Sequence, residues 1–293
     1  MTKLEQVQKI SCLLLDEFIR ICREHNLQWY IDAGSLLGVI RHGGFIPWDS
    51  DIDIVLPRAD YNLLYAEGDS WFQPPFYLYT SKNCSGDILT IKLNYSNSTF
   101  LLANKLTYYR NAENTFVLNG GIGLDIVPLD YIPEEQEKKA LLLDMIDFLY
   151  DGIEPANPEC KNDHQRLLVR AKCQHGAELY NKLMTSISNS PTSKVACTSW
   201  WRFDNSRGYT VPADCYSTFI EKSFSGCKEP VRVPIGYDTI LKAYYGDYMV
   251  EQPDKLQDRR LSKFLIDSGH SYKDYERFSN EELREMIKNN QTL

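Results

Sequence analysis

The sequence has no apolar run long enough to span a lipid bilayer. Its first twenty residues are not a secretion signal either, because Asp16, Glu17 and Arg20 interrupt their apolar part. Internal repeats and low-complexity segments are also missing. These absences favour a globular cytoplasmic protein with no transmembrane segment.

Positive charge is in the minority. The chain has 32 Lys and Arg against 40 Asp and Glu, which gives a formal net charge of -8. A protein whose main partner is the phosphate backbone of a nucleic acid is usually basic. The composition therefore argues against a nucleic-acid partner.

The eight cysteines include no C-x-x-C pair. In a cytoplasmic chain we expect them to be reduced thiols. One local group, made of Cys160, His164, Cys173 and His175, raises the question of a zinc site. Its spacing does not match the usual zinc patterns, so ordinary packing and surface positions are favoured over a metal.

Hydrophobic patterns divide the 293 residues near position 133. An amphipathic pattern predicts a helix over 3–26, and β-rich or alternating stretches predict strands over 51–57, 76–81, 88–95, 98–104 and 121–132. Shorter helices are expected over 35–42, 58–68 and 236–246. Longer helical patterns follow over 133–153 and 163–189, and another over 276–290. We therefore predict a catalytic core over 1–133 and a mainly helical, aromatic-rich part over 134–293.

Three aspartates, Asp49, Asp51 and Asp53, alternate with other residues just before an aliphatic run. Residues two apart in a strand point to the same side, so Asp51 and Asp53 share one face. Two close carboxylates repel each other, and partial burial makes the repulsion stronger. Hard divalent cations such as Mg²⁺ take oxygen ligands and would relieve it. The pattern predicts a metal site.

A similar acid follows in a later strand. Asp125 is flanked by Leu124 and Ile126, and a third carboxylate on a neighbouring strand would complete a site for one or two metals. Upstream, Gly34 and Ser35 begin a helix whose backbone N–H groups would form an anion site for a phosphate. This ordered combination is typical of the nucleotidyltransferase fold.

Two other interpretations apply to the aspartates. They could open a calcium-binding loop that ends at Asp60, but the glycine such a loop needs would be Ile54, inside a predicted strand. They could also be solvated turn residues, which suits Asp49 better than Asp53. Two roles stay open for Asp49, which are support of the metal ligands and capping of the turn.

The run "DAGSLLGVIRHGGFIPWDSDIDIVLPRADY" over 32–61 resembles the LicD family, whose members transfer phosphocholine from CDP-choline to cell-surface glycans. Fukutin and its relatives, which transfer ribitol phosphate from a CDP donor, share this core. The resemblance continues through "IKLNYSNST", "GIGLDIVPLDYIP" and "VRVPIGYDTILKAYYGDYM". It spans most of 28–253, with little to match over 140–225. Ser50 stands where many members have a further Asp.

The resemblance implies roles for nine residues. The resemblance assigns both catalysis and the binding of Mg²⁺ or Mn²⁺ to Asp51, Asp53 and Asp125. The donor's phosphates would lie at the Gly-Ser turn, near family positions that keep polar or basic groups; these donor-binding residues are Gly34, Ser35, Arg41, His42 and Lys92. Lys92 could equally be an exposed strand lysine. Trp48 would either stack on a ligand or anchor the packing.

The resemblance also implies an α/β (α+β) fold, with a nucleotidyltransferase-like mixed sheet and flanking helices. Its reaction would be Mg²⁺-dependent transfer of phosphocholine from CDP-choline to a hydroxyl of a teichoic acid or lipopolysaccharide-type precursor, releasing CMP. That glycan acceptor would be soluble or lipid-linked at the inner face of the membrane. Residues 134–293 would cover the cleft and shape the binding of the acceptor. Alternatives are another CDP-linked polyol phosphate, nucleotidyl transfer to a small molecule or protein, and a glycan-binding module without activity. The intact acids argue against the last.

Overall fold

The computed structural model describes residues 1–83, 90–111, 113–140, 142, 178–179, 181–188, 190–196, 210–251 and 261–293. The four residues considered for zinc lie outside these ranges. Only parts of the helices predicted over 133–153 and 163–189 are described, and 136–140 and 181–188 are helical as expected. Within the described residues, no helix is both long and apolar enough to cross a membrane.

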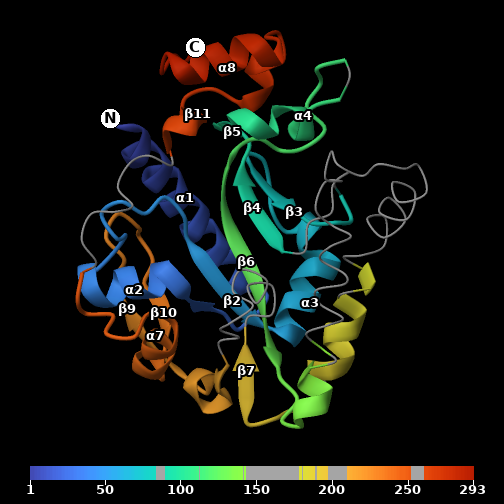
Figure 1. Cartoon of the computed structure of the whole chain (residues 1–293), viewed down its shortest axis with the longest axis vertical. Helices are drawn as coiled ribbons and strands as arrows, with labels where there is room; N and C mark the ends of the chain where they lie inside the picture. The colour runs from blue at the N-terminus through green and yellow to red at the C-terminus, as the bar shows by residue number, and fades with distance from the viewer. Residues whose placement is uncertain are drawn as a thin grey trace.

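A mixed sheet forms the centre of the structure (Figure 1). Its main strands run in the order β1-β2-β6-β4-β3. The β2–β6 pair is parallel and the other pairs are antiparallel. Their bounds are β1 Tyr30–Ile31, β2 Asp53–Pro57, β3 Phe76–Tyr79, β4 Ile91–Tyr95 and β6 Ile122–Tyr131. The central strand β6 is therefore paired on both sides by strands that come from the first hundred residues.

Later parts of the chain extend this core. The last residues of β6 pair with β7, Lys194–Ala196, which pairs in turn with β8, Val211–Pro212. Two further antiparallel pairs join β9, Phe219–Lys222, to β10, Val231–Pro234, and β5, Thr99–Leu102, to β11, Phe264–Asp267. The predicted strand over 98–104 is thus confirmed, but it pairs with a C-terminal strand and not with the main sheet.

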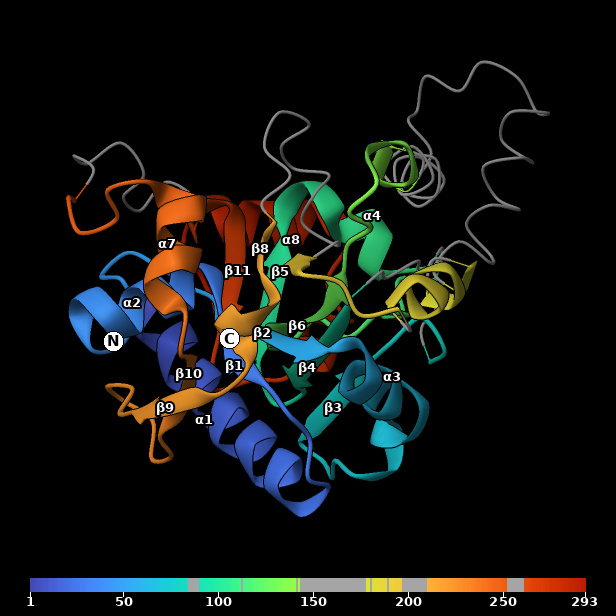
Figure 2. The ribbon, with the colours of Figure 1, turned by 90° about the horizontal axis from the view of Figure 1, so that it is seen from below.

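Helices flank the sheet. They are α1 Lys3–Glu24, α2 Ala33–His42, α3 Arg58–Glu67, α4 Leu106–Tyr109, α7 Tyr237–Tyr245 and α8 Asn280–Lys288. Helix α1 packs on β4, β6 and β11, while α7 packs on α2. In the view of Figure 2, α1 lies below the strands of the sheet and α7 lies above them. Helix α1 therefore packs directly on the sheet, whereas α7 lies against α2, which in turn contacts β2.

Helix α1 shows why the sequence folds this way. A capping box between Thr2 and Glu5 begins it, and its apolar stripe, which includes Leu14 and Phe18, is fully buried. Phe18 makes an edge-to-face contact with Trp29, with ring centroids 5.7 Å apart. Burying each such large side chain stabilises the fold by about 1.5–3 kcal/mol. The main core lies between α1 and the sheet.

The expected mixed α/β sheet with flanking helices is confirmed. The described residues after 133 contain the strands β7–β11 as well as helices, so this part is mixed where it is described. These strands are two to four residues long, too short for an alternating pattern to be recognised. The division of the chain at residue 133 stays a prediction.

Candidate active site

Neighbouring strands place polar residues in a row across the sheet. Asp53 on β2 lies opposite Asp125 on β6, and Asp125 lies opposite Lys92 on β4. Residues that face each other on adjacent strands point to the same side of a sheet. Asp32 follows β1 directly, and its N–H donates to the carbonyl oxygen of Asp53 at 3.1 Å. We call Asp32, Asp53 and Asp125 the carboxylate row.

The carboxylate row lies at the point where exposed residues are followed by buried strand residues. Strand β2 begins at Asp53, and the next three residues, Ile54, Val55 and Leu56, are fully buried. Asp51 precedes the strand and is exposed, while Asp53 and Asp125 are half-buried. The backbone N–H of Asp125 donates to the carbonyl oxygen of Ile52 at 3.1 Å, which holds the two strands together at this level.

Asp53 is under strong electrostatic strain. Its pKa lies well above the ordinary value of 3.8, and burial is the largest cause. The negative charges of Asp51 and Asp125 add to the effect of burial. Smaller contributions come from Asp49 and Asp32. Four carboxylates thus act on Asp53, and a bound cation would relieve this repulsion.

Lys92 forms an ion pair with Asp125. Burial by itself lowers the pKa of Lys92, but the charge and hydrogen bond of Asp125 outweigh it, so the pKa lies above its ordinary value. The Lys92 ammonium is therefore charged at neutral pH. It also acts on Tyr109 of α4, whose pKa burial raises and Lys92 lowers to a smaller extent.

The Gly-Ser turn lies beside the acids. The hydroxyl of Ser35 accepts a hydrogen bond from the N–H of Asp53 at 3.0 Å and donates to the carbonyl oxygen of Asp51 at 3.4 Å. Ser35 is only 3% exposed, so its side chain holds the backbone that carries the two acids. A side chain at Gly34 would approach Asp49 Oδ2 to 2.9 Å. Phosphate binding at this turn stays a prediction.

Arg41 and His42 lie at the other end of α2. Seven residues separate Ser35 from His42, which is about 10 Å along a helix axis. Arg41 donates to His42 Nε2 at 2.9 Å and to the carbonyl oxygen of Tyr248 at 2.8 Å. Burial and the charge of Arg41 lower the pKa of His42, while Glu251 opposes them. The contacts described for this pair thus connect α2 to the segment after α7 and not to the carboxylate row.

Trp48 is half-buried and packs against the main core. These contacts favour the packing interpretation of this residue over the ligand-stacking one.

The comparisons with known proteins agree with this geometry. Residues 26–121 match the family model described as LicD/FKTN/FKRP, nucleotidyltransferase domain. This segment is therefore similar to the nucleotidyltransferase domains of the LicD family. It contains Asp51, Asp53 and Lys92, and Asp125 follows four residues beyond it.

Longer similarity extends through most of the chain. A lipopolysaccharide cholinephosphotransferase LicD of Haemophilus influenzae is 25% identical over 265 residues, which cover 85% of this chain and 93% of that protein. Uncharacterized proteins of Rickettsia prowazekii and Rickettsia typhi are each 36% identical over 47 residues, or 16% of this chain. These short matches cover 18% and 15% of the two Rickettsia proteins.

Two tyrosine hydroxyls lie close to Asp32 of the carboxylate row. Asp32 is fully buried, and the hydroxyls of Tyr216 and Tyr244 each lie 3.4 Å from its Oδ2. No role for Asp32 was predicted from the sequence, although its place two residues before Gly34 was a signal for one. The tyrosines lie far along the chain, and only the tertiary fold brings them here.

The chemistry of the row fits a hard divalent cation, since its donor atoms are carboxylate oxygens. The part of the chain that the structure describes does not bring three His, Cys, Asp or Glu side chains together as a ready-made metal site. Magnesium usually takes only one or two carboxylates and completes its shell with water and substrate phosphate oxygens. Asp51 and Asp53 can supply these two ligands, and the strain on Asp53 supports a cation there.

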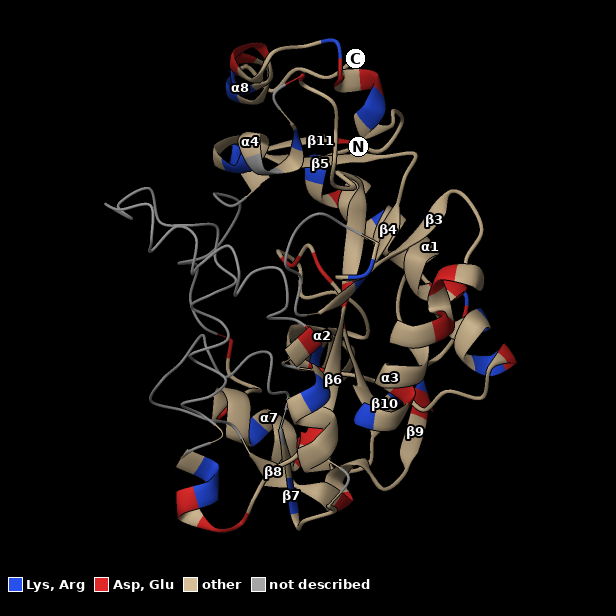
Figure 3. Cartoon of the chain, turned by 90° about the vertical axis from the view of Figure 1, so that its right-hand side faces the viewer, with Lys and Arg blue, Asp and Glu red and all other residues tan. Residues whose placement is uncertain are grey.

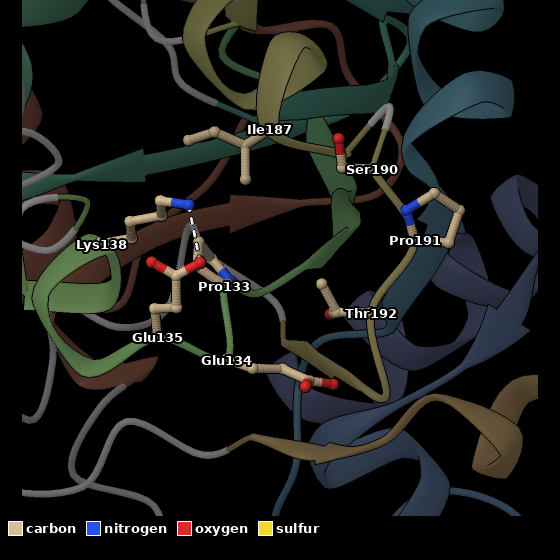
Figure 4. A pocket seen from close by; sticks show the side chains of 8 residues that line it. All are labelled: Pro133, Glu134, Glu135, Lys138, Ile187, Ser190, Pro191 and Thr192. Carbon is tan, nitrogen blue, oxygen red and sulfur yellow. Dashed lines mark hydrogen bonds and ion pairs between the residues drawn. The ribbon is translucent and has the colours of Figure 1, made fainter.

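Charges elsewhere are mixed. Figure 3 shows basic and acidic residues side by side on α8, while the strands of the sheet are mostly uncharged. A cavity of about 480 Å³ lies beyond the end of β6. Figure 4 shows its lining residues, which are Pro133, Glu134, Glu135, Lys138, Ile187, Ser190, Pro191 and Thr192. None of them belongs to the carboxylate row, so this cavity is separate from the candidate site.

Proposed function

We propose that this chain transfers phosphocholine from CDP-choline to a hydroxyl of a cell-surface glycan precursor, in a reaction that needs a divalent cation and releases CMP. The observation that carries this proposal is the similarity to a lipopolysaccharide cholinephosphotransferase over 85% of the chain. The carboxylate row supports it, because acids on adjacent strands are suited to phosphoryl transfer.

Asp51 and Asp53 would hold the metal, with Asp125 as a further ligand or neighbour. When bound, Mg²⁺ or Mn²⁺ would neutralise the charge on the donor's pyrophosphate. Ser35 would keep the backbone of Asp51 and Asp53 in place through its two hydrogen bonds. Mutual placement of the two acids thus depends on α2 as well as on β2.

Asp125 would accept the proton of the acceptor hydroxyl. Lys92 donates to Oδ1 of Asp125 and orients the carboxylate, and we assign proton acceptance to Oδ2. The acceptor oxygen would then attack the choline-bearing phosphorus as the bond to CMP breaks. This is a single displacement with both substrates bound at once.

A donor screen tests the proposal. Thermal shift would be measured with CDP-choline, CDP-ribitol, CDP-glycerol and nucleoside triphosphates, each with Mg²⁺ and with EDTA, because a ligand of the native state raises the melting temperature. Transfer of the best donor to a glycan would then be followed by ³¹P NMR. CMP as the product supports the proposal. Pyrophosphate released from a nucleoside triphosphate donor would indicate nucleotidyl transfer. A response to CDP-ribitol alone would indicate that the transferred group is a polyol phosphate and not phosphocholine.

Isotope exchange tests the route. Labelled CMP, incubated with enzyme, Mg²⁺ and CDP-choline but no acceptor, is expected to stay out of the donor pool. Rapid exchange, or a phosphocholine adduct on His42 or Ser35, would indicate a covalent intermediate and exclude the single displacement.

A further inference from the structure

The C-terminal end of α7 reaches the carboxylate row. Helix α7 packs on α2 and ends at Tyr245, where Gly246 takes a positive φ of 66°. The hydroxyl of Tyr244 lies 3.4 Å from Oδ2 of Asp32. Arg41 fixes the following segment by donating to the carbonyl oxygen of Tyr248 at 2.8 Å. Tyr244 thus ties this end of α7 to the carboxylate row, and Arg41 ties the following segment to α2.

Tyr245 differs from the other tyrosines at the site in its exposure. Its side chain is 42% exposed, whereas Tyr216 is only 7% exposed. The ring of Tyr245 lies edge-on to that of Tyr244, with centroids 6.1 Å apart and planes at 81°. The Tyr245 ring is therefore accessible next to Tyr244, while the hydroxyls of Tyr216 and Tyr244 are directed at buried Asp32.

The surroundings of Tyr245 are strongly negative. Burial of its hydroxyl raises the pKa of Tyr245, and the charge of Asp53 is the next cause. Asp32, Asp49 and Asp51 act in the same direction. An exposed aromatic ring in the electrostatic field of these four carboxylates attracts a cationic group through that field and through the negative face of the ring.

We infer that Tyr245 forms the aromatic wall of a subsite for the quaternary ammonium of the donor's head group. This inference rests on the proposed function. A trimethylammonium cannot donate hydrogen bonds, so ring faces and nearby negative charge are what can recognise it. In CDP-choline only one oxygen and two carbons separate the ammonium from the transferred phosphorus. A residue at the edge of the carboxylate row is therefore at the right place for the head group.

The cytosine base is the competing occupant of the Tyr245 ring. The base lies beyond the ribose and the second phosphate, on the far side of the bond that breaks. A ring next to the acids that would serve the transferred phosphorus is closer to the head group than to the base. A donor analogue that changes only the head group separates these two possibilities.

The test compares two donors. One is CDP-choline, and the other is the CDP ester of 3,3-dimethylbutanol, in which an uncharged carbon replaces the nitrogen. Their affinities would be measured by calorimetry in Mg²⁺ for the wild type, Tyr245→Phe, Tyr245→Leu and the control Tyr77→Leu. Tyr77 is 38% exposed on β3, so the control removes a comparably exposed ring elsewhere. Melting temperatures would confirm that each variant folds.

We expect the wild type to prefer CDP-choline over the neutral donor. Tyr245→Leu is expected to weaken CDP-choline binding by about 3- to 30-fold and to remove most of this preference, while Tyr245→Phe and Tyr77→Leu keep it. An unchanged preference for CDP-choline in Tyr245→Leu would overturn the subsite. Equal weakening of the binding of both donors would overturn it as well, because it would indicate that Tyr245 contacts the nucleotide. A wild type without preference and without phosphocholine transfer would overturn the proposed function itself.

Discussion

Lys92 and Asp125 face each other on the antiparallel strands β4 and β6, and their side chains form an ion pair. Asp125 also faces Asp53 on its other side, across the parallel β2–β6 pair. The site therefore contains its own cation beside its acids. This arrangement keeps part of the negative charge balanced before any ligand binds, and it gives Lys92 a more specific role than a surface lysine.

Replacing Lys92 is expected to affect activity more than stability. The side chains of Lys92 and Asp125 are 41% and 33% exposed, so we expect Lys92→Met to change the free energy of unfolding by less than about 1 kcal/mol. Turnover should fall by about tenfold or more, because Asp125 loses the group that orients it. Lys92→Arg should recover part of the turnover. Urea unfolding and initial rates would measure both effects, and unchanged turnover in Lys92→Met would contradict this role.

Replacing Asp51 or Asp53, at the start of β2, is expected to abolish most activity without destabilising the metal-free protein. Asp51→Asn and Asp53→Asn should each lower turnover at saturating Mg²⁺ by at least about a hundredfold, since each removes a metal ligand. Without metal, Asp53→Asn should be as stable as the wild type or more stable, because it removes one of several repelling charges. Near-normal turnover in either variant would refute the assignment.

The stability of the metal-free protein should depend on pH through Asp53. A raised pKa means that the folded state binds this proton more tightly than the unfolded chain does. The stabilisation from Asp53 is therefore full below its ordinary value of 3.8 and is lost as the pH rises through the raised folded-state pKa. Unfolding in EDTA from about pH 4 to about pH 8 should show a steeper loss for wild type than for Asp53→Asn. Parallel curves would show that Asp53 is not perturbed.

A buried ion pair should matter for stability. Arg58 at the start of α3 makes two hydrogen bonds of 2.6 Å to Asp130 near the end of β6, and their side chains are 4% and 0% exposed. Arg58→Met should cost about 3–5 kcal/mol, because it leaves Asp130 buried without its cation. The double variant with Asp130→Leu should lose less than the sum of the single changes. The exposed pair of Arg20 is the control, and Arg20→Met should cost no more than about 1 kcal/mol.

Two thiols are placed to form a disulfide under oxidation. The sulfur atoms of Cys12 on α1 and Cys227 lie 2.8 Å apart, and the hydrogen bond from Cys227 lowers the pKa of Cys12. Hydrogen peroxide should convert Cys12 to a sulfenic acid, which Cys227 then attacks with release of water. The bridge should raise the melting temperature by about 5 °C or more. Peptide mapping would identify it, and Cys12→Ser, the control, should show no such rise.

The sequence predicted part of this site for clear physical reasons. The flanking aliphatic residues were enough to place Asp125 on a strand, as β6 confirms. The two-residue period predicted a shared face for Asp51 and Asp53, but β2 begins only at Asp53, so for Asp51 this stays a prediction. The register between strands is different, because it depends on main-chain pairing over seventy residues and no local pattern encodes it. The same limit explains why the partner of Lys92 was not foreseen.

Other parts of the site depend on tertiary packing. Ser35 looked like a phosphate contact because of its place at a helix start, yet its hydroxyl bonds to the backbone at Asp51 and Asp53. Tyr245 comes from a helix about two hundred residues further along the chain, which only packing on α2 brings to the acids. Local propensity gives no information on such contacts.

The carboxylate row has a consequence for how this protein can diverge. Main-chain hydrogen bonds between β1, β2, β6 and β4 fix the spacing of its members, so core side chains can be exchanged without moving the acids as long as the strands stay paired. Three of every four aligned positions differ from the Haemophilus protein. An insertion of one residue in β2 or β6 would do more harm than many such exchanges, since it would turn the acids toward the core. Along these strands, natural selection should tolerate substitution far more readily than a change of length.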